Sequence, residues 1–160
     1  MLISNFFVKK QVKAFTSRLF DEKSFYSSFL SDLEDCKHEV IIESPFISRK
    51  RMDILLPFFR RLVNRDVTAY VITKDPNILK EPLATYSSKV IREFEVLGVH
   101  VLAALNHHHR KLAILDRQVL WEGSLNILSQ TNSREIMRRI EGEDHAKEMF
   151  EFLKLRRFIK

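Results

Sequence analysis

The chain has 160 residues, 45% hydrophobic and 30% charged, a balance typical of a globular protein of one domain. Its 27 Lys and Arg outnumber 21 Asp and Glu, and this net charge of +6 favours a polyanionic partner, either nucleic acid or an anionic membrane surface. No apolar run reaches the roughly 20 residues of a membrane-spanning helix, and we expect no secretion signal. Cys36 is the only cysteine, which excludes an internal disulfide and fits a cytoplasmic protein.

Helices and strands are predicted to alternate over the first two thirds of the chain. We expect a helical N-terminal extension over residues 1–21, with its helix at Val8–Phe20, and then a helix over Glu22–Cys36. The short run Glu39–Ser44 is rich in β-branched residues and stops before Pro45, which predicts a buried strand. Two helix-to-strand units follow: Ser48–Asn64 with Val67–Thr73, and Ala84–Leu97 with Val99–Ala104.

Closely spaced strands are predicted in the last third of the chain, before a final helix. The strands cover His108–Leu115, Gln118–Trp121 and Glu135–Ile140, and Asp116-Arg117 forms a tight turn. The final helix covers Glu143–Phe158. This order predicts an α/β fold, a mixed β-sheet flanked by helices, in a single domain over residues 1–160.

One segment is the most informative about function, because it places five polar side chains and a glycine within 18 residues. They are His109, Lys111, Asp116, Gly123, Ser124 and Asn126. A neutral histidine can attack phosphorus, and a protonated one can donate a proton to the leaving oxygen. Lys111 and Asn126 can stabilise the non-bridging oxygens, and Ser124 can hydrogen-bond beside them. Gly123 lets the backbone approach a phosphate, so the segment predicts a phosphodiester site.

An attacking histidine needs an acceptor on its other ring nitrogen. Two carboxylates are candidates: Asp116, seven residues after His109 across a turn, and Glu135, at the start of the next predicted strand. The residues alone leave the choice between them open.

The spacing of these residues resembles the signature of the phospholipase D superfamily, whose members cleave or transfer phosphodiesters through a phosphohistidine. The resemblance implies a phospholipase D-like domain over nearly the whole chain. It also implies that Glu135 orients the nucleophile and that Asp116 ties the loop together. The chemistry needs two histidines, and one motif per chain therefore implies a homodimer whose two copies of His109 face each other.

Three further stretches resemble the phospholipase D-like modules at the ends of some bacterial DNA helicase and AAA-type chains. They are Ser44–Ser48, Trp121–Ser129 and Glu135–Arg139. This resemblance makes a helicase or an ATPase a candidate partner. The chain itself lacks the G-x-x-x-x-G-K-[ST] motif of an ATPase.

Several residues near the motif are candidates for substrate binding. Arg134 and Arg138 can contact phosphates, Trp121 can stack a base, and Ser44 can reach the substrate from the loop after the first buried strand. Trp121 also fits the core or a dimer interface.

The triplet His107-His108-His109 suggests a metal site only weakly, because adjacent strand residues point to opposite faces. We expect no metal and no cofactor. The leading function is a metal-independent phosphodiesterase of nucleic acid, most of all a DNA endonuclease. The alternatives are a phospholipid phosphodiesterase or phosphatidyl transferase, and a catalytically idle nucleic-acid-binding module of a larger complex.

Overall fold

A mixed β-sheet organises the molecule. The computed structural model describes residues 14–105, 108–129 and 132–159, and within these ranges seven strands form one sheet in the order β1-β7-β6-β5-β2-β3-β4. The strands are β1 (Thr16–Asp21), β2 (Glu39–Glu43), β3 (Thr68–Lys74), β4 (His100–Ala104), β5 (Leu112–Leu115), β6 (Val119–Gly123) and β7 (Ile136–Glu141). β2, β3 and β4 are parallel, and the remaining pairs are antiparallel. The predicted fold class is therefore confirmed.

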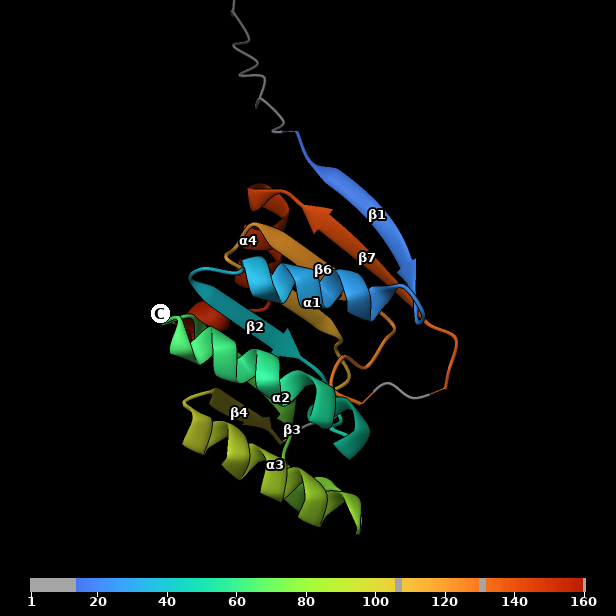
Figure 1. Cartoon of the computed structure of the whole chain (residues 1–160), viewed down its shortest axis with the longest axis vertical. Coiled ribbons are helices and arrows are strands. Elements are labelled where there is room, and N and C mark those ends of the chain that lie inside the picture. Colours follow the sequence, from blue (N-terminus) through green and yellow to red (C-terminus); the bar gives the residue numbers. More distant parts are fainter. Residues whose placement is uncertain (1–13, 106–107, 130–131, 160) are drawn as a thin grey trace, which may run out of the picture.

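Helices cover both faces of this sheet. They are α1 (Phe25–Asp35), α2 (Arg49–Asn64), α3 (Leu83–Leu97) and α4 (Glu143–Phe152), with short 3-10 turns at Pro76–Ile78 and Leu155–Arg157. Figure 1 shows α1, α2 and α3 across one face and α4 behind the sheet. The larger core lies under the first three helices and contains Trp121, while a smaller core packs Phe150 of α4 against Ile114 and Ile140. No helix in the described ranges is both long and apolar enough to cross a membrane.

Local signals position the helices that flank the site. Ser48 caps α2, where its Oγ accepts a hydrogen bond from Arg51 N, and Pro57 lies inside this helix. Gly98 ends α3 at φ 98°, in the left-handed region that glycine adopts without a Cβ clash. These ends agree with the boundaries predicted from the sequence.

The predicted N-terminal helix is wrong where the structure tests it. Residues 16–21 form β1, which pairs antiparallel with β7 and closes that edge of the sheet. Pairing with β7 outweighs the local helical pattern, because it gives backbone groups of β7 their partners. The rest of that prediction, from Val8 to residue 13, lies outside the described residues.

The largest other differences from the predicted boundaries are at the start of β5 and at the end of α4. β5 begins at Leu112, so His109 and Lys111 precede the strand instead of lying on it. The last helix ends at Phe152, six residues early, because Lys154 adopts a left-handed conformation with φ 55° and starts a 3-10 turn.

Candidate active site

His109 and Lys111 are in direct contact just before β5. Lys111 Nζ lies 2.8 Å from His109 Nδ1 and also donates a 2.7 Å hydrogen bond to the His109 carbonyl oxygen. His109 is exposed, so its ring is accessible to a substrate. While Lys111 donates to Nδ1, a neutral ring carries its own proton on Nε2. Attack through Nε2 therefore requires Lys111 to leave Nδ1.

Positive and negative charges meet around the Lys111 ammonium. Partial burial lowers the pKa of Lys111, Glu135 opposes that change, and Lys74 adds to it. Lys74 ends β3, and its ammonium lies 4.3 Å from the centre of the Phe46 ring. The sequence analysis did not select Lys74. Its position at the carboxyl end of a buried parallel strand, beside the strand that leads to Ser44, was the available signal.

Glu135 lies near Lys111 but does not hold His109 in this structure. Its Oε1 accepts a 2.7 Å hydrogen bond from Ser133 Oγ, and its backbone N–H donates to Glu22. Among the described residues, the ring contact of His109 is Lys111. The expected hydrogen bond between Glu135 and His109 is thus not formed here, and the orienting role of Glu135 stays a proposal.

Gly123 is the last residue of β6, and Gly123 and Ser124 face the start of β7. Ser124 Oγ accepts a 3.1 Å hydrogen bond from Ile136 N, and Ser124 N donates to Ile136 O. A Cβ on Gly123 would lie 2.1 Å from Ile136 O, so this glycine is required by the close approach of β7. The close approach of β7 is enough to explain why residue 123 is glycine, without the expected role in letting the backbone approach a phosphate.

Asn126, which the sequence analysis selected, has a buried polar atom without a partner among the described residues. Its Oδ1 is buried and has no hydrogen-bond partner within the described part of the chain. Such an atom costs stability unless something binds it. The amide can also turn and present its nitrogen, which donates to a phosphate oxygen.

Three predicted site residues have structural positions instead. Asp116 lies beyond the far end of β5 from His109, where it accepts hydrogen bonds from the N–H groups of residues 37–39 and from Cys36 Sγ. Trp121 is fully buried and cannot stack a base. Ser44 is also fully buried, and its Oγ accepts a hydrogen bond from Leu128 N instead of facing a substrate. The substrate contacts expected of Trp121 and Ser44 are wrong, because both side chains are buried and hydrogen-bonded inside the protein. Asp116 has the loop-tying position that the resemblance implied and is not among the groups beside His109.

The predicted arginines are on the open surface near the motif. Arg138 donates a 2.8 Å hydrogen bond to Ser17 Oγ, and Arg134 is exposed just before β7. A cavity of about 480 Å³ brings Arg138 together with Arg110 and Lys111. Three cations and one acidic residue, Glu122, thus line one opening, and this excess of positive charge suits a phosphodiester.

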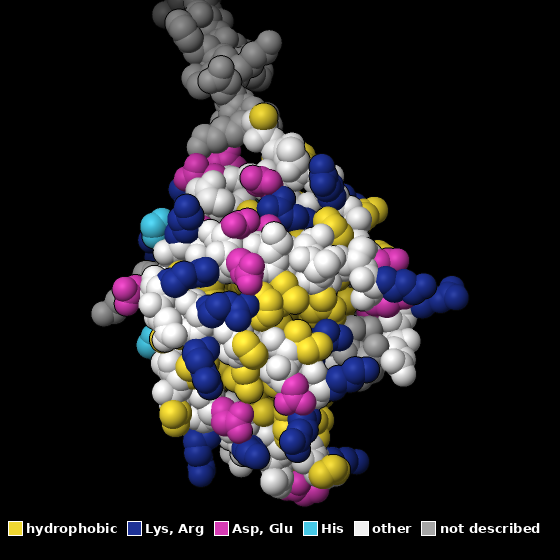
Figure 2. Space-filling view, viewed as in Figure 1, with side chains coloured by type: hydrophobic (Ala, Val, Ile, Leu, Met, Phe, Trp, Pro, Cys, Tyr) yellow, Lys and Arg dark blue, Asp and Glu magenta, His cyan; other side chains and the backbone are white. Residues whose placement is uncertain are grey.

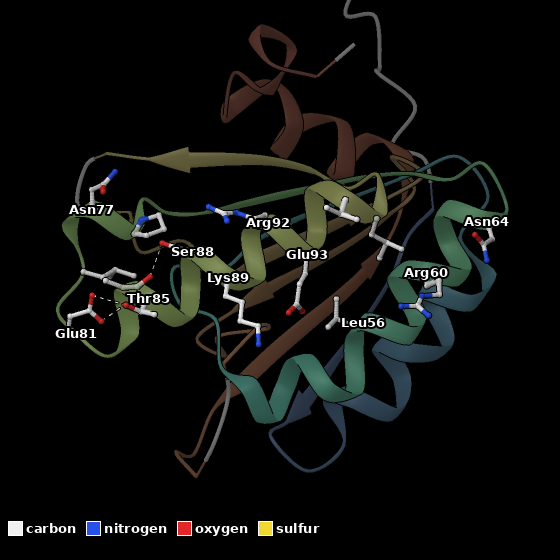
Figure 3. Close-up of a pocket in the computed structure, with 15 residues that line it drawn as sticks. Leu56, Arg60, Asn64, Asn77, Glu81, Thr85, Ser88, Lys89, Arg92 and Glu93 are labelled. Carbon is white, nitrogen blue, oxygen red and sulfur yellow. Dashed lines mark hydrogen bonds between the residues drawn. The ribbon is translucent and has the colours of Figure 1, made fainter.

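A second, larger cavity lies away from the motif. It has a volume of about 1180 Å³ and lies between α2 and α3, where Arg60, Lys89 and Arg92 stand near its rim (Figure 3). None of the motif residues lines it. The space-filling view shows the face covered by α1, α2 and α3, on which basic and acidic side chains are interspersed (Figure 2). Size alone therefore does not make this cavity the active site.

Metal-binding geometry is not found among the described residues. No three His, Cys, Asp or Glu side chains in the described ranges gather as ligands of one ion. His107 lies outside the described residues, and His108 faces Glu43, at 3.9 Å between Nε2 and Oε2.

Comparison with known proteins gives a consistent result. Residues 29–155 match the family model described as "Cardiolipin synthase, PLD-like domain". No curated protein matches the chain at the sequence level. Among solved structures, Nuc, a phospholipase D family member from Salmonella typhimurium, matches with TM-score 0.69 and 16% identity over 88% of this chain and 93% of Nuc.

Two more structures share the fold. NucT from Helicobacter pylori matches with TM-score 0.67 and 16% identity over 88% of this chain and 94% of NucT. A phosphatidylserine synthase from Haemophilus influenzae matches with TM-score 0.65 and 11% identity over 91% of this chain but 38% of the synthase. At these identities the likeness is one of fold.

Proposed function

Because the chain belongs to the phospholipase D-like domain family of cardiolipin synthase, we propose that it is a metal-independent phosphodiesterase that cleaves nucleic acid, DNA in particular. The observation that carries the proposal is the contact between His109 and Lys111, a nucleophile beside a phosphate-binding cation. Arg110, Arg138 and Lys111 share one opening, which suits a polyanionic backbone. The fold shared with Nuc and NucT, each matched over more than nine tenths of its own length, is compatible with this proposal.

The reaction is a displacement in two steps. His109 Nε2 forms a bond to phosphorus while the bond from phosphorus to the leaving oxygen breaks, and that oxygen takes a proton from His109 of a second copy. Water then attacks phosphorus, gives its proton to the histidine of the second copy, and breaks the bond between nitrogen and phosphorus. One motif per chain makes a homodimer part of the proposal.

Lys111 has two roles in this sequence of events. In the free protein it donates to His109 Nδ1, and a bound phosphate offers it a stronger, charged acceptor. Once Lys111 turns to the phosphate, the ring proton can move through solvent from Nε2 to Nδ1, and the Nδ1–H group can then donate a hydrogen bond to a carboxylate. Glu135 is the carboxylate we propose for it, since its charge already acts on Lys111. Asn126 and Ser124 would bind the remaining oxygens.

Exposed apolar residues around the opening support the proposal that a second copy of the chain binds there. Leu19, Ile136 and Phe152 line the same cavity as Lys111 and are 62%, 63% and 77% exposed. Exposed apolar side chains gathered at one site indicate an interaction surface. The same apolar residues also favour a second candidate function, in which the chain cleaves or transfers a phospholipid and the acyl chains rest on them.

A nicking assay in EDTA tests the function. Purified protein should nick supercoiled DNA without divalent metal, and radiolabelled DNA should form a covalent adduct on a denaturing gel. His109→Ala should abolish both, whereas His100→Ala, an exposed histidine on β4, should keep both. Nicking that requires a divalent metal, or that persists in His109→Ala, would contradict the mechanism. Headgroup release from phospholipid vesicles without DNA cleavage would favour the lipid reaction.

A further inference from the structure

Glu43 is a buried carboxylate directly beneath the catalytic segment. It is the last residue of the central strand β2 and is only 2% exposed. Its backbone pairs with Leu112, the first residue of β5, so its side chain lies where residues 108–111 enter the sheet. A buried glutamate is costly unless it is paired or performs a function.

The carboxylate faces both chain neighbours of His109. Oε2 lies 3.9 Å from His108 Nε2, and Oε1 lies 3.9 Å from Arg110 Nη1. Oε2 and His108 Nε2 are both buried and have no hydrogen-bond partner in the described ranges. Two unsatisfied polar atoms that face each other in the interior require an explanation.

We propose that Glu43 is a positioning residue for His109. Its carboxylate would act through its contacts with His108 and Arg110, the residues on either side of His109. This inference rests on the proposed phosphodiesterase function. β5 starts at Leu112, and the backbone hydrogen bond from Gly123 N of β6 reaches only Lys111 O, at 3.3 Å, so the ladder does not hold residues 108–110. Glu43 supplies the missing constraint through side chains, and the His109 ring is presented between the two anchored residues.

The charges around Glu43 fit this role. Burial raises the pKa of Glu43, and Arg110 opposes that change. Burial also lowers the pKa of His108, and charge interactions with Arg110, Lys74, Lys111 and His109 lower it further. The ionised form of Glu43, which Arg110 favours, would reduce the mutual repulsion of these cations in the segment that carries the nucleophile.

Glu43→Gln tests the inference because it keeps the shape and removes the charge. The matched control is Glu39→Gln, the same substitution at the other end of β2, where Glu39 pairs with Arg117. In the DNA-nicking assay we expect Glu43→Gln to lower kcat about 10- to 100-fold, as a small misplacement of a catalytic group does, with KM nearly unchanged. Glu39→Gln should lower the melting temperature and keep kcat.

A second readout does not depend on cleavage. Nitrogen-15 NMR of the His109 ring reports its tautomer and its pKa, and both should change in Glu43→Gln and not in Glu39→Gln. If wild-type protein fails to cleave DNA, the proposed function fails while this measurement still decides the role of Glu43. Unchanged His109 signals, together with unchanged kcat per folded molecule, would overturn the inference.

Arg110→Gln keeps the proposal falsifiable if Glu43→Gln does not fold. Arg110 is exposed, and its replacement removes one of the two contacts without opening the core. It should change the His109 signals in the same direction and lower kcat. An increase in KM with unchanged kcat would assign Arg110 to substrate binding alone and would overturn the proposed positioning role of Glu43.

Discussion

The indole Nε1 of Trp121 donates a 2.7 Å hydrogen bond to Oδ2 of Asp32, which fastens β6 to α1. The same carboxylate accepts hydrogen bonds from Arg139 on β7, so one acidic side chain joins three elements. Phe20, Phe25 and Phe29 pack around the indole ring. Trp121 therefore supports the sheet beneath the candidate site and does not meet the substrate.

Trp121→Phe should weaken folding and leave DNA binding intact. Loss of the hydrogen bond to Asp32 should lower the free energy of unfolding by about 1–3 kcal/mol, the cost of a charged or unsatisfied partner. Urea denaturation followed by circular dichroism measures the first effect, and fluorescence anisotropy of labelled DNA measures the second. Unchanged stability with about tenfold weaker binding would return Trp121 to the substrate interface.

Asp116→Asn should change the stability of the protein in acid. Burial favours a higher pKa for Asp116, but hydrogen bonds from the N–H groups of residues 37–39 and from Cys36 lower it below its usual 3.8. The stabilisation by this carboxylate is therefore present above the unfolded pKa and is lost as pH falls through the folded pKa.

Thermal melting of wild type and Asp116→Asn from neutral pH to pH 3 checks this. The variant should have a lower melting temperature at neutral pH and a flatter decline in acid. Asp53→Asn, an exposed substitution on α2, should behave as wild type. Activity per folded molecule should stay the same in Asp116→Asn, and a selective loss of kcat would restore Asp116 to the reacting groups.

Gly123→Ala should separate β6 from β7. The added Cβ would meet Ile136 O at 2.1 Å and Met137 Sδ at 2.8 Å, and a backbone oxygen cannot move as a side chain can. We expect a loss of at least about 1–3 kcal/mol in the free energy of unfolding. Glu122→Ala, the neighbouring position on β6, is the control. Full stability with lost activity would instead mean that the glycine serves the phosphate.

Arg134→Gln and Arg138→Gln should weaken DNA binding most at low salt. If each arginine neutralises one phosphate, each substitution should reduce the slope of log K against log salt by about 1. Arg61→Gln is the control, because Arg61 lies on α2 and pairs with Glu34. Anisotropy titrations at several salt concentrations measure the slope. An equal change in Arg61→Gln would assign the effect to net charge alone.

The sequence predicted elements whose ends carry their own signals. Ser48 at the start of α2, Gly98 at the end of α3 and Pro45 after β2 each fix a boundary through local chemistry. The strand expected at His108–Leu115 was too long, for a reason outside that segment. β2 ends at Glu43, which pairs with Leu112, so no partner extends the ladder back to His109.

The candidate site was predicted in part. The spacing of His109 and Lys111 identified two residues that the structure brings into contact. Glu43 and Lys74 were missed because each looks like an ordinary strand residue, and their nearness to His108 depends on how β2, β3 and β5 align. The resemblance implied that Asp116 ties a loop together, but spacing could not identify its partners, because they lie at residues 36–39.

The first strand, β1, has a practical consequence for the choice of fragment to express. The family match begins at residue 29, which lies inside α1 and leaves β1 behind. A fragment trimmed to that match would expose the outer row of β7 backbone groups and remove the Phe20 and Phe25 contacts with Trp121. An exposed strand edge of this kind can pair with strands of other molecules, so such a fragment would tend to aggregate. Expression fragments should therefore start before Thr16.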